Sequence, residues 1–236
     1  MIDRIARAYR GAGYRYKVGP VLPTAYVGVD LGQARDYTTT AVLSVLPSEH
    51  GKEIPLRKRQ MECRRLERIP LRTPYPEIVR YVAKLCRHLQ SIMGKVYLLL
   101  DATGVGRPVV NMFEAAGLDP IGITVTSGHD VTRGEQPNSV NVPKRDLISS
   151  LQVAMHLGNM HVARNLKFAE TFKRELDMFK VKITTKGSLR LEAWRESDHD
   201  DLVFAMAMAC WAATYEDFDR YTPAGGATMS SIWVPR

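Results

Sequence analysis

Three short acidic segments, far apart in the chain, could each aim a carboxylate at one shared point. They are residues 28–32 with Asp30, residues 98–104 with Asp101, and residues 197–202 with Asp198, Asp200 and Asp201. The first two end apolar runs, and the third opens an apolar stretch. Oxygen ligands supplied singly by separate elements suit Mg²⁺ or Mn²⁺, which take few protein carboxylates and keep several waters. The pattern predicts metal-dependent phosphodiester chemistry.

The first two carboxylates each belong to an otherwise apolar segment. Asp30 interrupts the run from Tyr26 to Leu31, and burying it without a partner would be costly, which favours a nearby cation. Asp101 follows the apolar residues 96–100, at the carboxyl end of a predicted strand, where open α/β sheets bind their ligands. The simpler alternative is that Asp30 bonds a turn amide and Asp101 caps the next turn.

The third segment holds more acids than a helix start requires. One Asp or Ser is enough to cap a helix, and acids in a first turn suit the helix dipole without any further role. Adjacent helical residues point about 100° apart, so we expect only one of Asp200 and Asp201 to face the other carboxylates. Asp201 is favoured because it directly precedes the apolar residues 202–204. His199 is interpreted first as a polar cap and second as a ligand.

Three such carboxylates would support two Mg²⁺ or Mn²⁺ ions about 3.5–4 Å apart, one activating water and one stabilising the leaving 3′ oxygen. Asp30, on the expected central strand, would be the shared ligand. Asp36 is either an accessory residue that orients water or part of an ordinary Asx turn. Lys144 and Arg145 open a predicted helix against its dipole, which favours phosphate contact for both.

The hydrophobic pattern predicts the elements that position these residues. Strands are expected over 25–31, 38–46, 56–68 (an exposed edge strand), 96–100 and 120–125; helices over 76–93, 107–116, 143–157, 165–179 and 199–214; a mobile loop over 127–141; and a hairpin from 181–185 and 188–194. Three strands followed by alternating helices and strands is the order of a ribonuclease H-like domain. We therefore expect an α/β fold with a central mixed sheet flanked by helices and an appended β-hairpin.

The length of 236 residues allows one full domain, expected over 25–216, with a basic arm at 1–24 and a flexible tail at 217–236. The formal net charge of +8 favours a polyanionic partner such as nucleic acid. The expected sequence-independent DNA contacts, which would weaken with salt, are Arg57, Lys58, Arg59, Lys144, Arg145, Lys182, Lys186 and Arg190.

Three widely spaced cysteines without a CxxC pair argue against a disulfide framework or a zinc knuckle. No apolar run approaches the roughly 18 residues that would cross a bilayer, and the first residues lack the apolar core of a signal peptide. We expect a soluble, intracellular protein without a membrane partner.

Four segments resemble the nuclease domain of phage terminase large subunits. They are residues 27–38, 100–106, 141–147 and 199–203, and the last, His-Asp-Asp-Leu-Val before an alanine-rich helix, is the most specific. The resemblance implies a ribonuclease H-like endonuclease that cuts double-stranded viral DNA during packaging in the host cytoplasm. It also implies a divalent metal held by Asp30, Asp101 and Asp200 or Asp201. The implied partners are a portal protein, a small terminase subunit and a separate ATPase.

Two features depart from that family. The chain has no GxxxxGK[ST] motif for a packaging ATPase, so we expect an isolated nuclease domain or a stand-alone relative. Phe204 stands where related nucleases often place a further acid. The alternatives are a Holliday-junction resolvase with the same fold and metals, an actin-like or sugar-kinase-like ATPase using Asp30 and Thr38–Thr40 as a phosphate loop, and a DNA-binding module without catalysis.

Overall fold

The computed structural model describes residues 22–32, 36–46, 59–103, 106–184 and 200–222. Its elements in chain order are β1 (Thr24–Asp30), β2 (Thr38–Val45), β3 (Met61–Ile69), α2 (Tyr75–Gln90), β4 (Lys95–Asp101), α3 (Gly106–Ala115), β5 (Ile121–Thr126), β6 (Thr132–Arg133), β7 (Ser139–Pro143), α4 (Lys144–His156), β8 (Met160–Val162), α5 (Ala169–Thr184), α6 (Asp201–Thr214) and the short 3₁₀ helix η3 (Phe218–Tyr221). Most predicted elements are confirmed to within a few residues.

One mixed sheet carries all the described strands, in the order β6-β7-β5-β4-β1-β2-β3-β8. β1, β2 and β3 are antiparallel neighbours, whereas β4 and β5 join β1 in parallel. Three antiparallel strands extended by parallel ones through crossover helices are the core of the ribonuclease H-like fold, and this prediction is confirmed. The carboxyl ends of β1, β3, β4, β5 and β7 consequently meet at one edge.

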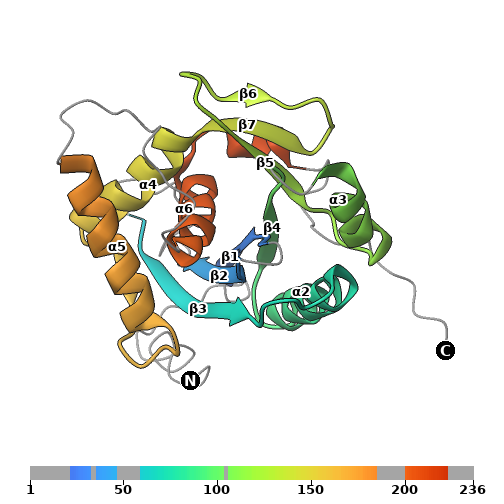
Figure 1. Ribbon diagram of the computed structural model, residues 1–236, viewed down its shortest axis with the longest axis horizontal. Helices are drawn as coiled ribbons and strands as arrows, with labels where there is room; N and C mark the ends of the chain where they lie inside the picture. The colour runs from blue at the N-terminus through green and yellow to red at the C-terminus, as the bar shows by residue number, and fades with distance from the viewer. Residues whose placement is uncertain (1–21, 33–35, 47–58, 104–105, 185–199, 223–236) are drawn as a thin grey trace, which may run out of the picture.

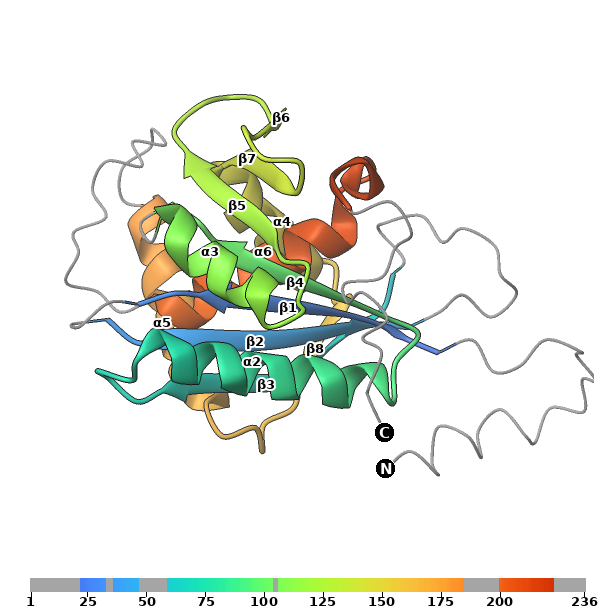
Figure 2. The same ribbon diagram turned by 90° about the vertical axis from the view of Figure 1, so that its right-hand side faces the viewer.

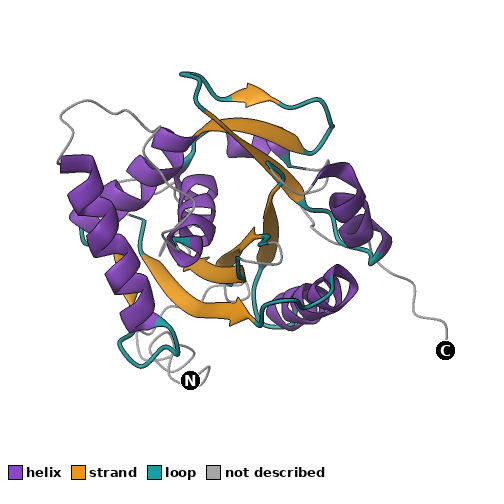
Figure 3. Ribbon diagram, in the orientation of Figure 1, coloured by secondary structure: helices purple, strands orange, loops and turns teal. Residues whose placement is uncertain are grey.

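Two apolar cores lie on opposite faces of the sheet. Helices α2 and α3 cover one face, and α4, α5 and α6 lie on the other, where the sheet curves around α6 (Figure 1; Figure 3). Every residue of α6 from Asp201 to Ala213 is buried, which agrees with its nearly all-apolar sequence. The side view in Figure 2 shows β1 and β2 running lengthwise through the centre of the molecule.

The close approach of α6 to β1 depends on one glycine. A Cβ atom built on Gly28 would lie 1.9 Å from the backbone oxygen of Ala205. Because a backbone carbonyl cannot rotate away as a side chain can, Gly28→Ala should separate helix from sheet and destabilise the protein by about 3 kcal/mol or more.

Chemical denaturation measures this effect, with Gly122→Ala in β5 as the control. The nearest atom to a Cβ on Gly122 is 3.6 Å away, an ordinary contact, so that variant should stay within about 1 kcal/mol of wild type. Equal stabilities for the two variants would contradict the described packing of α6 on β1.

Several element predictions are wrong. Residues 132–133 and 139–143 form β6 and β7 inside the expected mobile loop, because Val140 and Val142 alternate into the core. β8 pairs with Met61–Cys63 outside β3, so β3 is not the edge strand. Residues 181–184 belong to α5 instead of a hairpin strand, and the hairpin's other strand, 188–194, lies outside the described residues.

The packed part continues past the expected domain end at 216. Phe218 and Tyr221 of η3 are buried in the α6-side core, where Phe218 lies edge-on to Tyr97 and Trp211. These contacts attach residues 218–221 to the domain. Residues 1–21 of the expected arm at 1–24, and residues 223–236 of the expected tail at 217–236, lie outside the described residues.

Candidate active site

Four residues on four neighbouring strands form a row where β1 and β4 end, and we call this edge of the sheet the acidic edge. They are Asp101, Asp30, Thr39 and Arg68. Asp101 and Asp30 end the neighbouring strands β4 and β1, whose pairing runs to Leu100 and Val29. Asp30 is in register with Thr39 of β2, and Thr39 with Arg68 of β3. Side chains alternate along a strand, and the residues two positions away (Leu99, Gly28, Ala41 and Leu66) all face α6. The row therefore points toward the face that α6 covers.

The start of α6 brings the third acidic segment to this row. Asp200 precedes the helix at its N-cap position, and Asp201 is its first residue. The Thr39 hydroxyl donates to the backbone oxygen of Asp201 at 2.9 Å, and Arg68 Nη2 lies 3.8 Å from Asp201 Oδ2. Asp201 is only 8% exposed, whereas Asp200 is half-buried. The structure thus fixes Asp201 more tightly against the sheet than Asp200.

The carboxylates share one electrostatic environment. Burial raises the pKa of Asp30 well above its ordinary value, and the charge of Asp101 adds to the effect. The charge of Asp201 contributes more than that of Asp200, and Asp36 contributes least of the named acids. Burial likewise raises the pKa of Asp101, opposed by hydrogen bonding to Thr103 and by the positive charge of Lys144. An excess of negative charge at one partly buried point is what a divalent cation would neutralise.

The donor set fits a hard divalent cation. Asp30, Asp101 and Asp201 offer carboxylate oxygens from three separate elements, which is the ligand type that Mg²⁺ and Mn²⁺ take. Among the described residues, no three His, Cys, Asp or Glu side chains are already gathered closely enough to hold a metal ion. Like charges repel, so carboxylates of one site do not close on one another by themselves.

Sequence reasoning missed Glu175 of α5 and, as a site residue, Arg68. Glu175 is 5% exposed and accepts hydrogen bonds from the backbone N–H groups of Leu202 and Val203, at 3.1 and 3.2 Å, and from Arg68 Nη2 at 2.7 Å. Burial raises the pKa of Glu175 to about 7, although the Arg68 guanidinium favours its charged form. A signal was present, because Glu175 falls between Phe172 and Leu176 on the apolar stripe of its helix.

Three of the predicted DNA-contacting residues, Lys144, Arg145 and Arg59, have contacts that the structure describes. Lys144 begins α4 close enough to Asp101 to lower its pKa, and its Nζ lies 5.8 Å from the centre of the Phe204 ring. Arg145 Nη2 donates a hydrogen bond to the backbone oxygen of His129 at 2.6 Å, and Arg59 Nη1 donates to the backbone oxygen of Ala213 at 2.8 Å. The latter two guanidinium groups therefore have structural partners, and their DNA contact stays a prediction.

The remaining predicted residues cannot be placed at the acidic edge. Those outside the described residues are Arg57, Lys58, Lys186, Arg190 and His199. Lys182 falls in helix α5 instead of the predicted hairpin. Asp36 is exposed and lines a hollow of about 480 Å³ together with Gly32, Thr38 and residues 70–75. Its lining also includes Ile78 of the α2-side core, and Thr38 alternates with Thr39 along β2, so this hollow lies on the α2 side of the sheet.

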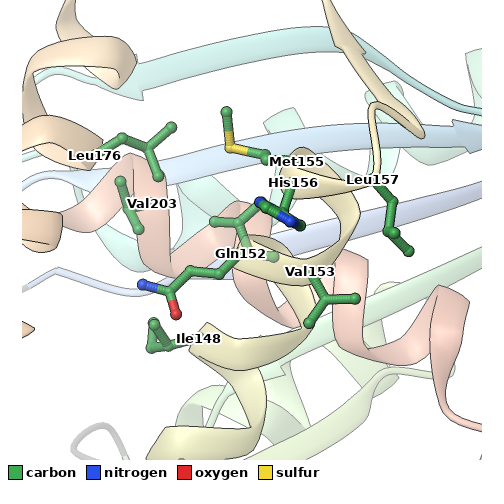
Figure 4. Close-up of a pocket in the computed structure, with 9 residues that line it drawn as sticks. Ile148, Gln152, Val153, Met155, His156, Leu157, Leu176 and Val203 are labelled. Carbon is green, nitrogen blue, oxygen red and sulfur yellow. The ribbon is translucent and has the colours of Figure 1, made fainter.

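A second hollow lies between α4, α5 and α6. It measures about 490 Å³ and is lined by residues of α4 with Leu176 and Val203 (Figure 4). Apart from Gln152 and His156 its lining is apolar, and no Asp or Glu takes part. The acidic edge is therefore the better candidate for phosphodiester chemistry.

Comparison with solved structures finds similar arrangements of elements. The large terminase nuclease from thermophilic phage G20c, in a form with bound zinc, is 22% identical (TM-score 0.44; 79% of this chain and 80% of that chain). The Mn-soaked human cytomegalovirus terminase nuclease domain is 13% identical (TM-score 0.47; 86% and 91%). Thermus thermophilus RuvC is 14% identical (TM-score 0.30; 83% and 97%).

This is a likeness of fold. No family model matches the sequence, and no curated protein does. No helix among the described residues has the length and apolarity to cross a membrane. At these levels of identity the neighbours assign no role to any residue of this chain, and the activity proposed below depends on its own carboxylates.

Proposed function

We propose that the protein is a metal-dependent endonuclease that hydrolyses phosphodiester bonds in double-stranded DNA. The observation that carries the proposal is that Asp30 and Asp101 end the neighbouring strands β1 and β4 while Asp201 opens α6 against β2 at the same edge, where burial, followed by the charges of Asp101 and Asp201, raises the pKa of Asp30. Carboxylates crowded in this way are a common feature of sites that hold Mg²⁺ or Mn²⁺.

Each residue has a distinct part in the proposal. Asp30 ends β1, which lies between β4 with Asp101 and β2, whose Thr39 contacts Asp201, so Asp30 would be the ligand that two ions share. A divalent cation bound there would supply an activated water and stabilise the leaving oxygen. Lys144, beside Asp101, would hold a phosphate oxygen of the substrate by its charge.

The finer biological role follows from the four sequence segments that resemble terminase nucleases. On that basis we propose that the substrate is viral DNA cut during genome packaging in the host cytoplasm. The energy of translocation would come from a separate ATPase, and the portal protein and the small terminase subunit would be the other partners.

Incubation with supercoiled plasmid tests the activity. Nicked and linear products should form with Mg²⁺ or Mn²⁺ and disappear when EDTA is added, whereas Ca²⁺ should bind but support little turnover. Cleavage that continues unchanged after chelation would refute the proposed chemistry. Tight nucleotide binding in calorimetry, with no cleavage, would favour the ATPase alternative instead.

A further inference from the structure

The first turn of α6 is capped by a residue from another helix. The first N–H groups of any helix lack partners within it, and a side chain at the N-cap position commonly supplies one. Asp200 occupies that position but makes no side-chain capping hydrogen bond. Glu175 Oε2 of α5 accepts from the N–H groups of Leu202 and Val203 instead, at 3.1 and 3.2 Å.

The other oxygen of Glu175 is joined to the acidic edge through Arg68. Arg68 Nη2 donates to Glu175 Oε1 at 2.7 Å and lies 3.8 Å from Asp201 Oδ2. The guanidinium carbon of Arg68 lies 5.0 Å from the centre of the Tyr37 ring, so the group is held on a second side. A continuous set of contacts thus leads from α5, through β3, to the start of α6.

These contacts leave Glu175 poorly suited to bind a metal itself. One of its oxygens accepts two backbone N–H groups, and the other accepts the guanidinium. A carboxylate engaged at both oxygens has little capacity left for a cation. Its negative charge beside the helix N-terminus and a buried guanidinium is instead suited to fixing position.

We propose that Glu175 is a positioning residue that, with Arg68, holds the first turn of α6 so that Asp201 faces Asp30 and Asp101. By capping the helix from outside, Glu175 performs the task that an Asp at the helix start would otherwise perform. The inference rests on the proposed nuclease function, because it assigns Asp201 to the metal centre. Its measurable consequence is that metal affinity depends on a residue that does not touch the metal.

Calorimetric titration with Mn²⁺ tests this dependence without relying on activity. In Glu175→Ala, Mn²⁺ affinity should fall about 10–100-fold, the usual cost of losing a group that orients a metal ligand. The kcat for plasmid cleavage should fall as well, with the KM for DNA nearly unchanged, and excess Mn²⁺ should restore part of the rate. Glu175→Gln retains an acceptor for the N–H groups but loses the charge facing Arg68, so its Mn²⁺ affinity should lie between those of wild type and Glu175→Ala.

The matched control is Glu170→Ala on the exposed side of the same helix, which should bind Mn²⁺ as wild type does. If Glu175→Ala does not fold, the Mn²⁺ affinity and the kcat of Glu175→Gln test the positioning role. Wild-type affinity and wild-type kcat in the folded variants would overturn the positioning role while leaving the nuclease proposal intact. A wild-type protein that neither binds Mn²⁺ nor cleaves DNA would overturn the nuclease proposal itself, and the positioning role with it.

Discussion

Replacing Asp30 with asparagine should abolish metal-dependent cleavage and, at the same time, stabilise the metal-free protein. Loss of the shared ligand should lower the rate by at least about 10³-fold, because metal-based stabilisation of a transition state is worth several kcal/mol. Asparagine keeps the size and one oxygen of aspartate, so the loss would come from the missing charge and not from a cavity.

The gain in stability follows from the raised pKa of Asp30. Burial, followed by the charges of Asp101 and Asp201, makes the ionised form unfavourable in the folded state. Because the folded pKa lies above the ordinary value of 3.8, this group stabilises the fold most at low pH, and its contribution is lost as pH rises through the folded pKa. Replacing this ionisable carboxyl by an amide should raise the unfolding free energy at neutral pH by about 0.5–2 kcal/mol, or a few degrees in Tm.

Thermal unfolding in EDTA, at pH values from about 3 to about 8 so that the series begins below the ordinary pKa of Asp30, measures this effect. Asp30→Asn should show a shallower fall in Tm with rising pH, and added Mn²⁺ should no longer raise its Tm. Asp177→Asn, an exposed partner of Lys173 on α5, is the control and should match wild type in stability and cleavage. A destabilised Asp30→Asn that still responds to Mn²⁺ would contradict the proposed role of Asp30.

Asp201→Asn should be as inactive as Asp30→Asn, whereas Asp200→Asn should retain cleavage within about 10-fold of wild type. Asp201 is buried, is anchored by Thr39 through its backbone, and acts on Asp30 more strongly than Asp200 does. Neighbouring residues at a helix start point in different directions, so one substitution cannot mimic the other.

Single-turnover cleavage at saturating Mn²⁺ separates the two variants, because it reports the chemical step without product release. Both substitutions remove one charge from the same helix start, so each serves as the control for the other. An inactive Asp200→Asn beside an active Asp201→Asn would reverse the assignment and leave Asp201 as a partner of Arg68 only.

The sequence predicted the parts of the site in which one residue type breaks a strong local pattern. Asp30 and Asp101 stand out because each adjoins a short apolar run of the kind that predicts a buried strand. The start of α6 stands out because consecutive acids precede an apolar helix. The sequence favours Asp201 over Asp200 because it directly precedes the apolar residues 202–204, and the hydrogen bond from Thr39 to its backbone supports that prediction.

The residues that sequence reasoning missed depend on contacts between distant elements. Glu175 lies on the apolar stripe of α5, but its partners Arg68, Leu202 and Val203 are far away in the sequence and meet it only when α5 packs against the start of α6. Arg68 is one of several arginines on β3, and only its register with Thr39 distinguishes it from Arg65, which pairs with Glu67 and Tyr81. The strands β6, β7 and β8 are too short for a periodic pattern to emerge above their turn-rich surroundings.

Anomalous scattering from a crystal of the wild-type protein soaked in Mn²⁺ would locate the metal site itself. Manganese should lie within coordination distance of the carboxylates of Asp30, Asp101 and Asp201, at the edge where β1 and β4 end. Manganese bound elsewhere, or none at these carboxylates in a protein that still cleaves DNA, would contradict this assignment.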